Sequence, residues 1–160
     1  MAKLEVIVEP GRQDIVLKRT FDAPRDVVFK AITDPALIPQ WWGPRRYETI
    51  VDEMDARPGG RWRYINRAPD GGEHAFHGVY HDLNAPESIT QTWEYEGFPG
   101  HVSLETLTLE EIDGKTVMTA LATYQSIEDR DGMAQSGMEE GAVEMYDRLD
   151  EVLEGLLSRV

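Results

Sequence analysis

The chain has 160 residues, of which 41% are hydrophobic, and both values fit a single folded domain with a substantial core. Acidic residues outnumber basic residues by 30 to 16, and the resulting net charge of −14 argues against a nucleic-acid surface and against docking to anionic lipid headgroups. The sequence has no cysteine, which excludes disulfides, thiol catalysis and cysteine-ligated zinc, and which is compatible with a cytoplasmic location.

Residues 1–10 alternate apolar and charged side chains without a long apolar core, so we expect neither a signal peptide nor insertion into a membrane. Residues 1–14 precede the first predicted strand. They are expected to form an N-terminal extension or an extra strand of one domain that covers residues 1–160. Residues 15–22 alternate as a first strand. Two short helices follow, because Asp22-Ala23-Pro24 and Asp34-Pro35 each combine a capping acid with a proline, which is typical of a helix start.

The middle of the chain is a run of six predicted strands. Turn signals such as Pro69-Asp70-Gly71-Gly72 and Asp113-Gly114 join them, and short links between successive strands imply an antiparallel meander. Aromatic residues recur at even spacing, so each strand can place its aromatic side chains on one face. The six strands are expected over residues 47–55, 60–67, 74–83, 88–96, 102–111 and 116–124.

The hydrophobic period changes near the C-terminus. Ser136 and Glu139 have the spacing of a capping box, which predicts a long helix over residues 137–158. Its apolar stripe recurs at alternating spacings of four and three residues, with Met138 and Met145 on it. The order of elements predicts an α+β fold in which a curved antiparallel sheet of about seven strands wraps around this helix.

Trp41-Trp42-Gly43-Pro44 is the most informative segment, because two adjacent tryptophans cannot both point into one small core. We expect Trp42 to face a hollow and Trp41 to face the helical corner. With Phe21-Asp22-Ala23-Pro24 and Asp34-Pro35, the segment resembles the START-like (SRPBCC, birch-pollen-allergen-like) superfamily with its helix-grip fold, and within it the family of the activator of heat-shock-protein-90 ATPase. Further matching residues are Pro58-Gly59-Gly60, Gly78-Val79-Tyr80, Thr92-Trp93, and Gly137-Met138 with Gly141.

The resemblance implies a deep, mostly apolar cavity between the sheet and the long helix. Superfamily members bind lipids, sterols, polyketides or plant hormones there, and some catalyse cyclisation or aromatisation. The eukaryotic co-chaperone of the family carries an additional N-terminal domain, for which residues 1–14 are too short, so its chaperone role is not carried over. We therefore expect this chain, as a stress-response or other member of the family, to bind a small hydrophobic molecule. The alternatives are a polyketide cyclase or aromatase that uses pocket Tyr or His groups as acid and base, and a chaperone-associated interaction module.

The predicted ligand-binding residues are aromatic side chains of the strands and small or adaptable residues of the long helix: Trp42, Trp62, Tyr64, Phe76, Tyr80, Trp93, Tyr95, Met138, Gly141 and Met145. A filled core is the alternative interpretation of the aromatic set. An inward Glu or Arg would be costly unless paired and would mark function, but the alternation assigns none.

No catalytic residue, cofactor or metal site is predicted. His77 and His81 share a strand face but lie about 13 Å apart along it, which is too far for shared ligation of a metal ion. The sequence leaves open whether the protein is a monomer or a homodimer.

Overall fold

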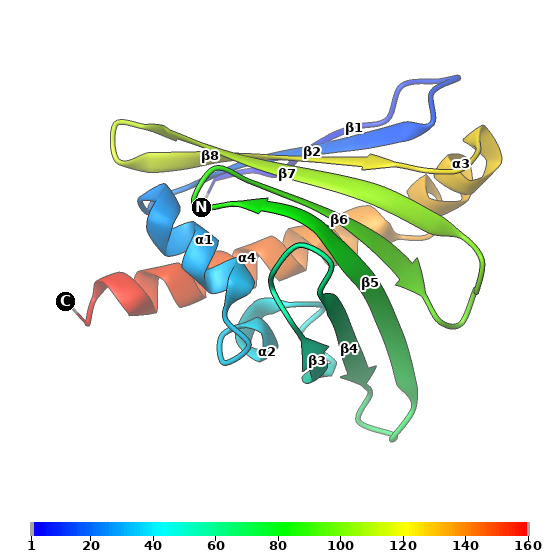
Figure 1. The fold of residues 1–160 in the computed structure, drawn as a ribbon, viewed down its shortest axis with the longest axis horizontal. Helices are drawn as coiled ribbons and strands as arrows, with labels where there is room; N and C mark the ends of the chain where they lie inside the picture. Colours follow the sequence, from blue (N-terminus) through cyan, green and yellow to red (C-terminus); the bar gives the residue numbers. More distant parts are fainter. Residues whose placement is uncertain (1, 160) are drawn as a thin grey trace.

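Eight antiparallel strands form one curved sheet in the computed structural model, which describes residues 2–159 (Figure 1). The order across the sheet is β1-β2-β8-β7-β6-β5-β4-β3. The strands are β1 (Glu5–Ile7), β2 (Asp14–Phe21), β3 (Glu48–Met54), β4 (Arg61–Arg67), β5 (Glu73–Asn84), β6 (Ser88–Tyr95), β7 (Val102–Ile112) and β8 (Lys115–Thr123). The predicted α+β helix-grip fold is confirmed. The sheet has one strand more than the predicted seven, because part of the N-terminal extension pairs with β2 as β1.

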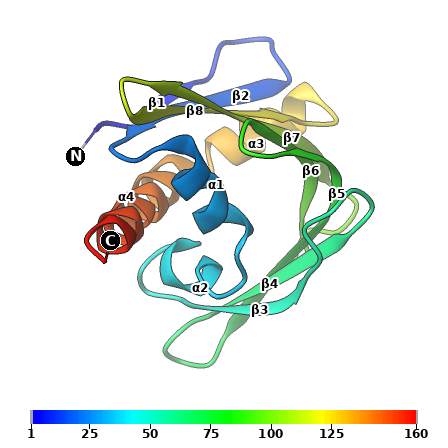
Figure 2. The same cartoon turned by 60° about the vertical axis from the view of Figure 1, so that its left-hand side comes forward.

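Four helices accompany the sheet: α1 (Arg25–Thr33), α2 (Ile38–Trp41), α3 (Ile127–Ala134) and α4 (Met138–Leu157). Figure 2 looks nearly along α4 and shows the sheet curving around it from β1 and β2 to β4 and β3, with α1 and α2 beside the helix. Met1 and Val160, which the expected domain included, lie outside the described residues. Within residues 2–159, no helix has the length and apolar character needed to cross a membrane.

The start of α4 differs from the predicted capping box. The N-cap residue is Gly137, whose φ of 85° lies in the left-handed region, and no side chain caps the helix there. Ser136 instead donates its hydroxyl to the carbonyl oxygen of Met133 at 2.6 Å, at the end of α3. The prediction placed the helix correctly within one residue but was wrong about its cap, because the turn between α3 and α4 depends on a glycine conformation and not on a side chain.

Arg19 joins α4 to the sheet. Its side chain is fully buried on β2, on the same face as Ile15 and Phe21. Nη1 lies 2.6 Å from Oδ1 of Asp147 and Nη2 lies 3.1 Å from Oδ2 of Asp150, both on α4. A buried guanidinium is tolerated only when it is paired, so these two carboxylates fix which face of α4 meets β2. Strand alternation places Arg19 on the face of Ile15 and Phe21, but the sequence alone did not identify it as a buried, paired arginine.

Replacing Arg19 with Met should lower the free energy of unfolding by about 2 kcal/mol, because two partly buried carboxylates would lose their shared cation. Urea denaturation followed by tryptophan fluorescence measures the change. Arg12→Met is the matched control, since Arg12 pairs with Asp14 at an exposed position where an ion pair contributes little. Equal effects of the two substitutions would contradict the role given to Arg19.

Candidate functional site

A cavity of about 310 Å³, the central cavity, lies between the concave face of the sheet and α4. This volume is at the lower end of the range typical for sites that hold small organic molecules. All of the predicted ligand-binding residues line it except Tyr95: Trp42, Trp62, Tyr64, Phe76, Tyr80, Trp93, Met138, Gly141 and Met145.

Trp42 stands at the centre of an aromatic cluster on the cavity wall. Its ring meets those of Trp62, Tyr64 and Phe76 edge-on, with ring centroids 6.3, 5.0 and 5.2 Å away. Edge-to-face pairs of this kind are favourable beyond the area that they bury. Trp41 also lines the cavity, but its indole Nε1 is anchored to α1, where it donates to the carbonyl oxygen of Ala31 at 3.0 Å.

The wall between β4 and β5 depends on a glycine. Alternation along β4 directs Trp62 and Tyr64 inward, and Trp62 lies against Gly78 of β5. A Cβ atom at Gly78 would meet Nε1 of Trp62 at 2.6 Å and the carbonyl oxygen of Thr92 at 1.9 Å, so no side chain fits there. Nε1 of Trp62 is buried and has no hydrogen-bond partner within the described part of the chain.

Among residues 2–159, Glu105 is the one acidic side chain on the wall of the central cavity. It lies on β7 opposite Gln91 of β6, whose Nε2 donates to Oε1 of Glu105 at 3.3 Å. The carboxyl group lies deep in the protein and keeps only the partial exposure that the cavity gives it, and this burial raises its pKa from 4.5 to about 7. Burial, with a contribution from the charge of Glu105, also raises the pKa of the phenols of Tyr124 and Tyr146.

Sequence reasoning missed Glu105. On the same strand face as Glu105, Leu107 is partly buried and Leu109 is fully buried. These two leucines were a usable signal that this face points inward. The opposite face carries Leu104 and Thr106, so apolar character did not distinguish the two faces of this strand. An inward acid had been expected to mark function, and the structure contains one.

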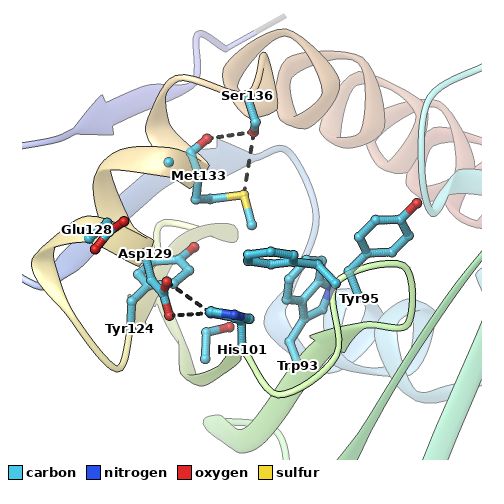
Figure 3. Close-up of a pocket in the computed structure, with 11 residues that line it drawn as sticks. Trp93, Tyr95, His101, Tyr124, Glu128, Asp129, Met133 and Ser136 are labelled. Atoms are coloured by element: carbon cyan, nitrogen blue, oxygen red, sulfur yellow. Dashed lines mark hydrogen bonds and ion pairs between the residues drawn. The ribbon is translucent and has the colours of Figure 1, made fainter.

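A second cavity of about 450 Å³, the outer pocket, lies between α3 and the loop that joins β6 to β7 (Figure 3). Tyr95 lines this pocket and not the central cavity. Nδ1 of His101 lies 2.9 Å from Oδ2 of Asp129 on α3, and the exposed ring of Phe98 stacks on the His101 ring with centroids 3.8 Å apart. These contacts join the β6–β7 loop to α3.

Three side chains line both cavities and therefore form the boundary between them. They are Trp93 of β6, Tyr124 just after β8, and Met133 of α3. In Figure 3 the thioether of Met133 points into the outer pocket from the α3 side, across from Trp93 and His101. The outer pocket thus lies directly outside the central cavity. No group of three or more metal-ligating side chains occurs among residues 2–159.

Gly141 of α4 lines the central cavity without being required by packing. A Cβ atom there would meet only Cγ of Pro44, at 3.9 Å, which is an ordinary contact. Close packing therefore does not require a glycine at this position. A larger side chain at this position would enter the cavity without a backbone clash. It would also favour the helix, because glycine is unfavourable inside a helix.

The sequence matches one family model, and the fold matches many solved structures. Residues 22–154 match the family model described as activator of Hsp90 ATPase homolog 1-like protein. A protein of Arthrobacter aurescens is 27% identical, with a TM-score of 0.87 over 94% of this chain and 91% of that one. Protein Ms6760 of Mycobacterium smegmatis is also 27% identical, with a TM-score of 0.84 over 96% and 97% of the two chains. A Rhodobacter sphaeroides protein, again 27% identical, has a TM-score of 0.87 over 94% and 99%. No curated protein matches the sequence.

Glu105→Gln should stabilise the ligand-free protein at high pH. The unfolded chain releases the Glu105 proton near pH 4.5, whereas the folded protein holds it up to about pH 7, so ionisation lowers stability as the pH rises between these values. At about pH 8 the substitution should raise the free energy of unfolding by about 3 kcal/mol, and at about pH 4 it should have no such effect. Urea denaturation at both pH values measures this difference.

Glu110→Gln is the control for that experiment. Glu110 is exposed on the opposite face of the same strand, so the substitution removes the same charge without touching the cavity. A Glu105→Gln protein that gains no more stability at high pH than Glu110→Gln would show that the carboxyl group is not desolvated.

Proposed function

The chain belongs to the activator of Hsp90 ATPase homolog 1-like family, and from this premise we propose that it binds a small hydrophobic molecule, such as a lipid, sterol or polyketide-like compound, in the central cavity. The observation that carries the proposal is an interior space of about 310 Å³ walled mainly by aromatic, aliphatic and methionine side chains. Protein interiors are close-packed and contain few voids larger than a water molecule. A space of this size therefore has the character of a binding site.

Two features of the cavity wall would contribute to binding in different ways. The aromatic cluster around Trp42 would supply affinity through apolar burial, at roughly 25 cal/mol per Å² of surface removed from water. The polar side chains of Gln91 and Glu105 would fix the orientation of the ligand. In this proposal the outer pocket is the entrance, because it shares Trp93, Tyr124 and Met133 with the central cavity.

In this proposal the protein acts as one START-like domain, as a monomer or homodimer in the cytoplasm. The absence of cysteine from its sequence is compatible with that location.

Filling the central cavity should abolish ligand binding. Gly141→Leu would place an isobutyl group in the cavity while improving the helical propensity of α4 by several tenths of a kcal/mol. Native mass spectrometry of protein purified without detergent should detect a copurified molecule on the wild type and none on the variant. Thermal-shift screening against lipids, sterols and polyphenols should give the same contrast.

Gly155→Leu supplies the control, because Gly155 lies on the same helix and does not line the central cavity. This variant should bind like the wild type. If neither the wild type nor Gly155→Leu retains or is stabilised by any hydrophobic compound, the ligand-binding proposal is wrong.

Glu105 favours a second candidate function, a cyclase-type or aromatase-type enzyme. A carboxyl group with a pKa of about 7 is well suited to general acid–base catalysis near neutral pH. Cyclisation of a polyketide-like chain begins with removal of a proton next to a carbonyl group, for which the Glu105 carboxylate would be the base. Tyr124 and Tyr146 lie close enough to the carboxylate for its charge to raise the pKa of both phenols, in addition to burial.

Deuterium exchange into the methyl group of 2-acetonaphthone, followed by NMR, tests this candidate. The wild type should accelerate exchange by about 100-fold over buffer, and Glu105→Gln should lose that acceleration. Exchange at the buffer rate in the presence of wild-type protein would remove the enzymatic candidate while leaving ligand binding in place.

A further inference from the structure

We propose that the ligand of the central cavity is a hydrophobic amine whose ammonium group pairs with Glu105 while its apolar body lies against the aromatic wall. The inference rests on the proposed ligand-binding function and narrows it to one chemical class. Within residues 2–159, no basic side chain neutralises the carboxylate of Glu105.

Few interactions within the protein stabilise the charge of Glu105. Its hydrogen bond from Gln91, at 3.3 Å, is long, and within residues 2–159 no basic side chain forms an ion pair with it. No Lys, Arg or His side chain of the described residues lines the central cavity. Arg19, which also lies on the inner face of the sheet, has two carboxylate partners. An unpaired buried carboxylate is unfavourable, so a cation brought by the ligand would relieve a cost present in the empty protein.

The surroundings of Glu105 suit an ammonium group. Trp93 follows Gln91 by two residues on the same face of β6, and the phenols of Tyr124 and Tyr146 lie within the influence of the Glu105 charge. Aromatic faces attract cations, most strongly those of Trp. The phenol oxygens can accept hydrogen bonds from the N–H groups that the carboxylate leaves free. A carboxylate beside aromatic rings therefore favours a protonated amine over an uncharged group of the same shape.

Other hydrophobic ligands fit this cavity less well. A fatty acid or another carboxylate would bring a second negative charge next to Glu105 with no base to neutralise the pair. The net charge of −14 opposes anions at long range as well. An alcohol can donate one hydrogen bond to Glu105 but leaves its charge in place. The expected order of affinity is amine, then alcohol, then acid.

Three probes that share one ring system test the order: 2-naphthylmethylamine, 2-naphthylmethanol and 2-naphthoic acid. Isothermal titration calorimetry at about pH 8, where Glu105 is ionised and the amine protonated, should show the amine binding about tenfold more tightly than the alcohol, with the acid weakest. Glu105→Gln should weaken the amine by about tenfold while leaving the alcohol within about threefold of its wild-type affinity.

Glu110→Gln separates the local effect from the change in net charge. It removes one negative charge from the exposed face of the same strand, so the amine should keep its wild-type affinity. Alcohol or acid binding as tightly as the amine, or an amine indifferent to Glu105→Gln, would overturn the inference and leave the proposed function standing. Failure of all three probes to bind, together with no copurified molecule on the wild type, would overturn both.

Discussion

The buried ion pairs between Arg19 and α4 hold the helix against one side of the sheet, and the shape of the interior follows from this attachment. Arg19 lies on β2, while the sheet continues through β8, β7, β6 and β5 to β4 and β3 as it curves around the helix. A single helix fixed at one side cannot fill a concave surface of this width. Aromatic side chains from the far strands occupy part of the remaining space, and the central cavity is the rest.

Arg19 and Glu105 both lie on the inner face of the sheet and differ in how their charges are balanced. Arg19 is fully buried, and both of its terminal nitrogens contact carboxylates, so its charge is paired within the chain although its Nε has no hydrogen-bond partner among residues 2–159. Glu105 has one long hydrogen bond and a pKa raised to about 7 by burial. A paired buried charge stabilises the fold, whereas an unbalanced one in a cavity is a candidate for contact with the ligand of the proposed function.

Much of the fold was predictable from the sequence, because strand alternation and turn residues are local signals. The Trp41-Trp42 segment indicated the family, and even spacing placed most of the aromatic residues on the wall that they occupy. The charged interior was not predictable in the same way. The partners of Arg19 lie 128 and 131 residues along the chain, so their pairing has no local signal. Glu105 lies on a strand with apolar residues on both faces, which leaves the inward face undetermined until the neighbouring strands are placed.

The boundary between the two cavities consists of the side chains of Trp93, Tyr124 and Met133, which come from β6, from the segment after β8 and from α3. No strand or helix backbone has to move for this partition to change. The extent of each cavity at this boundary is therefore set by the volumes of three side chains, independently of the sheet and of α4. Under the proposed function, a substitution at one of these positions would change the length of molecule that the cavity accepts, and Met133, unbranched and flexible, would let a single protein accept more than one length.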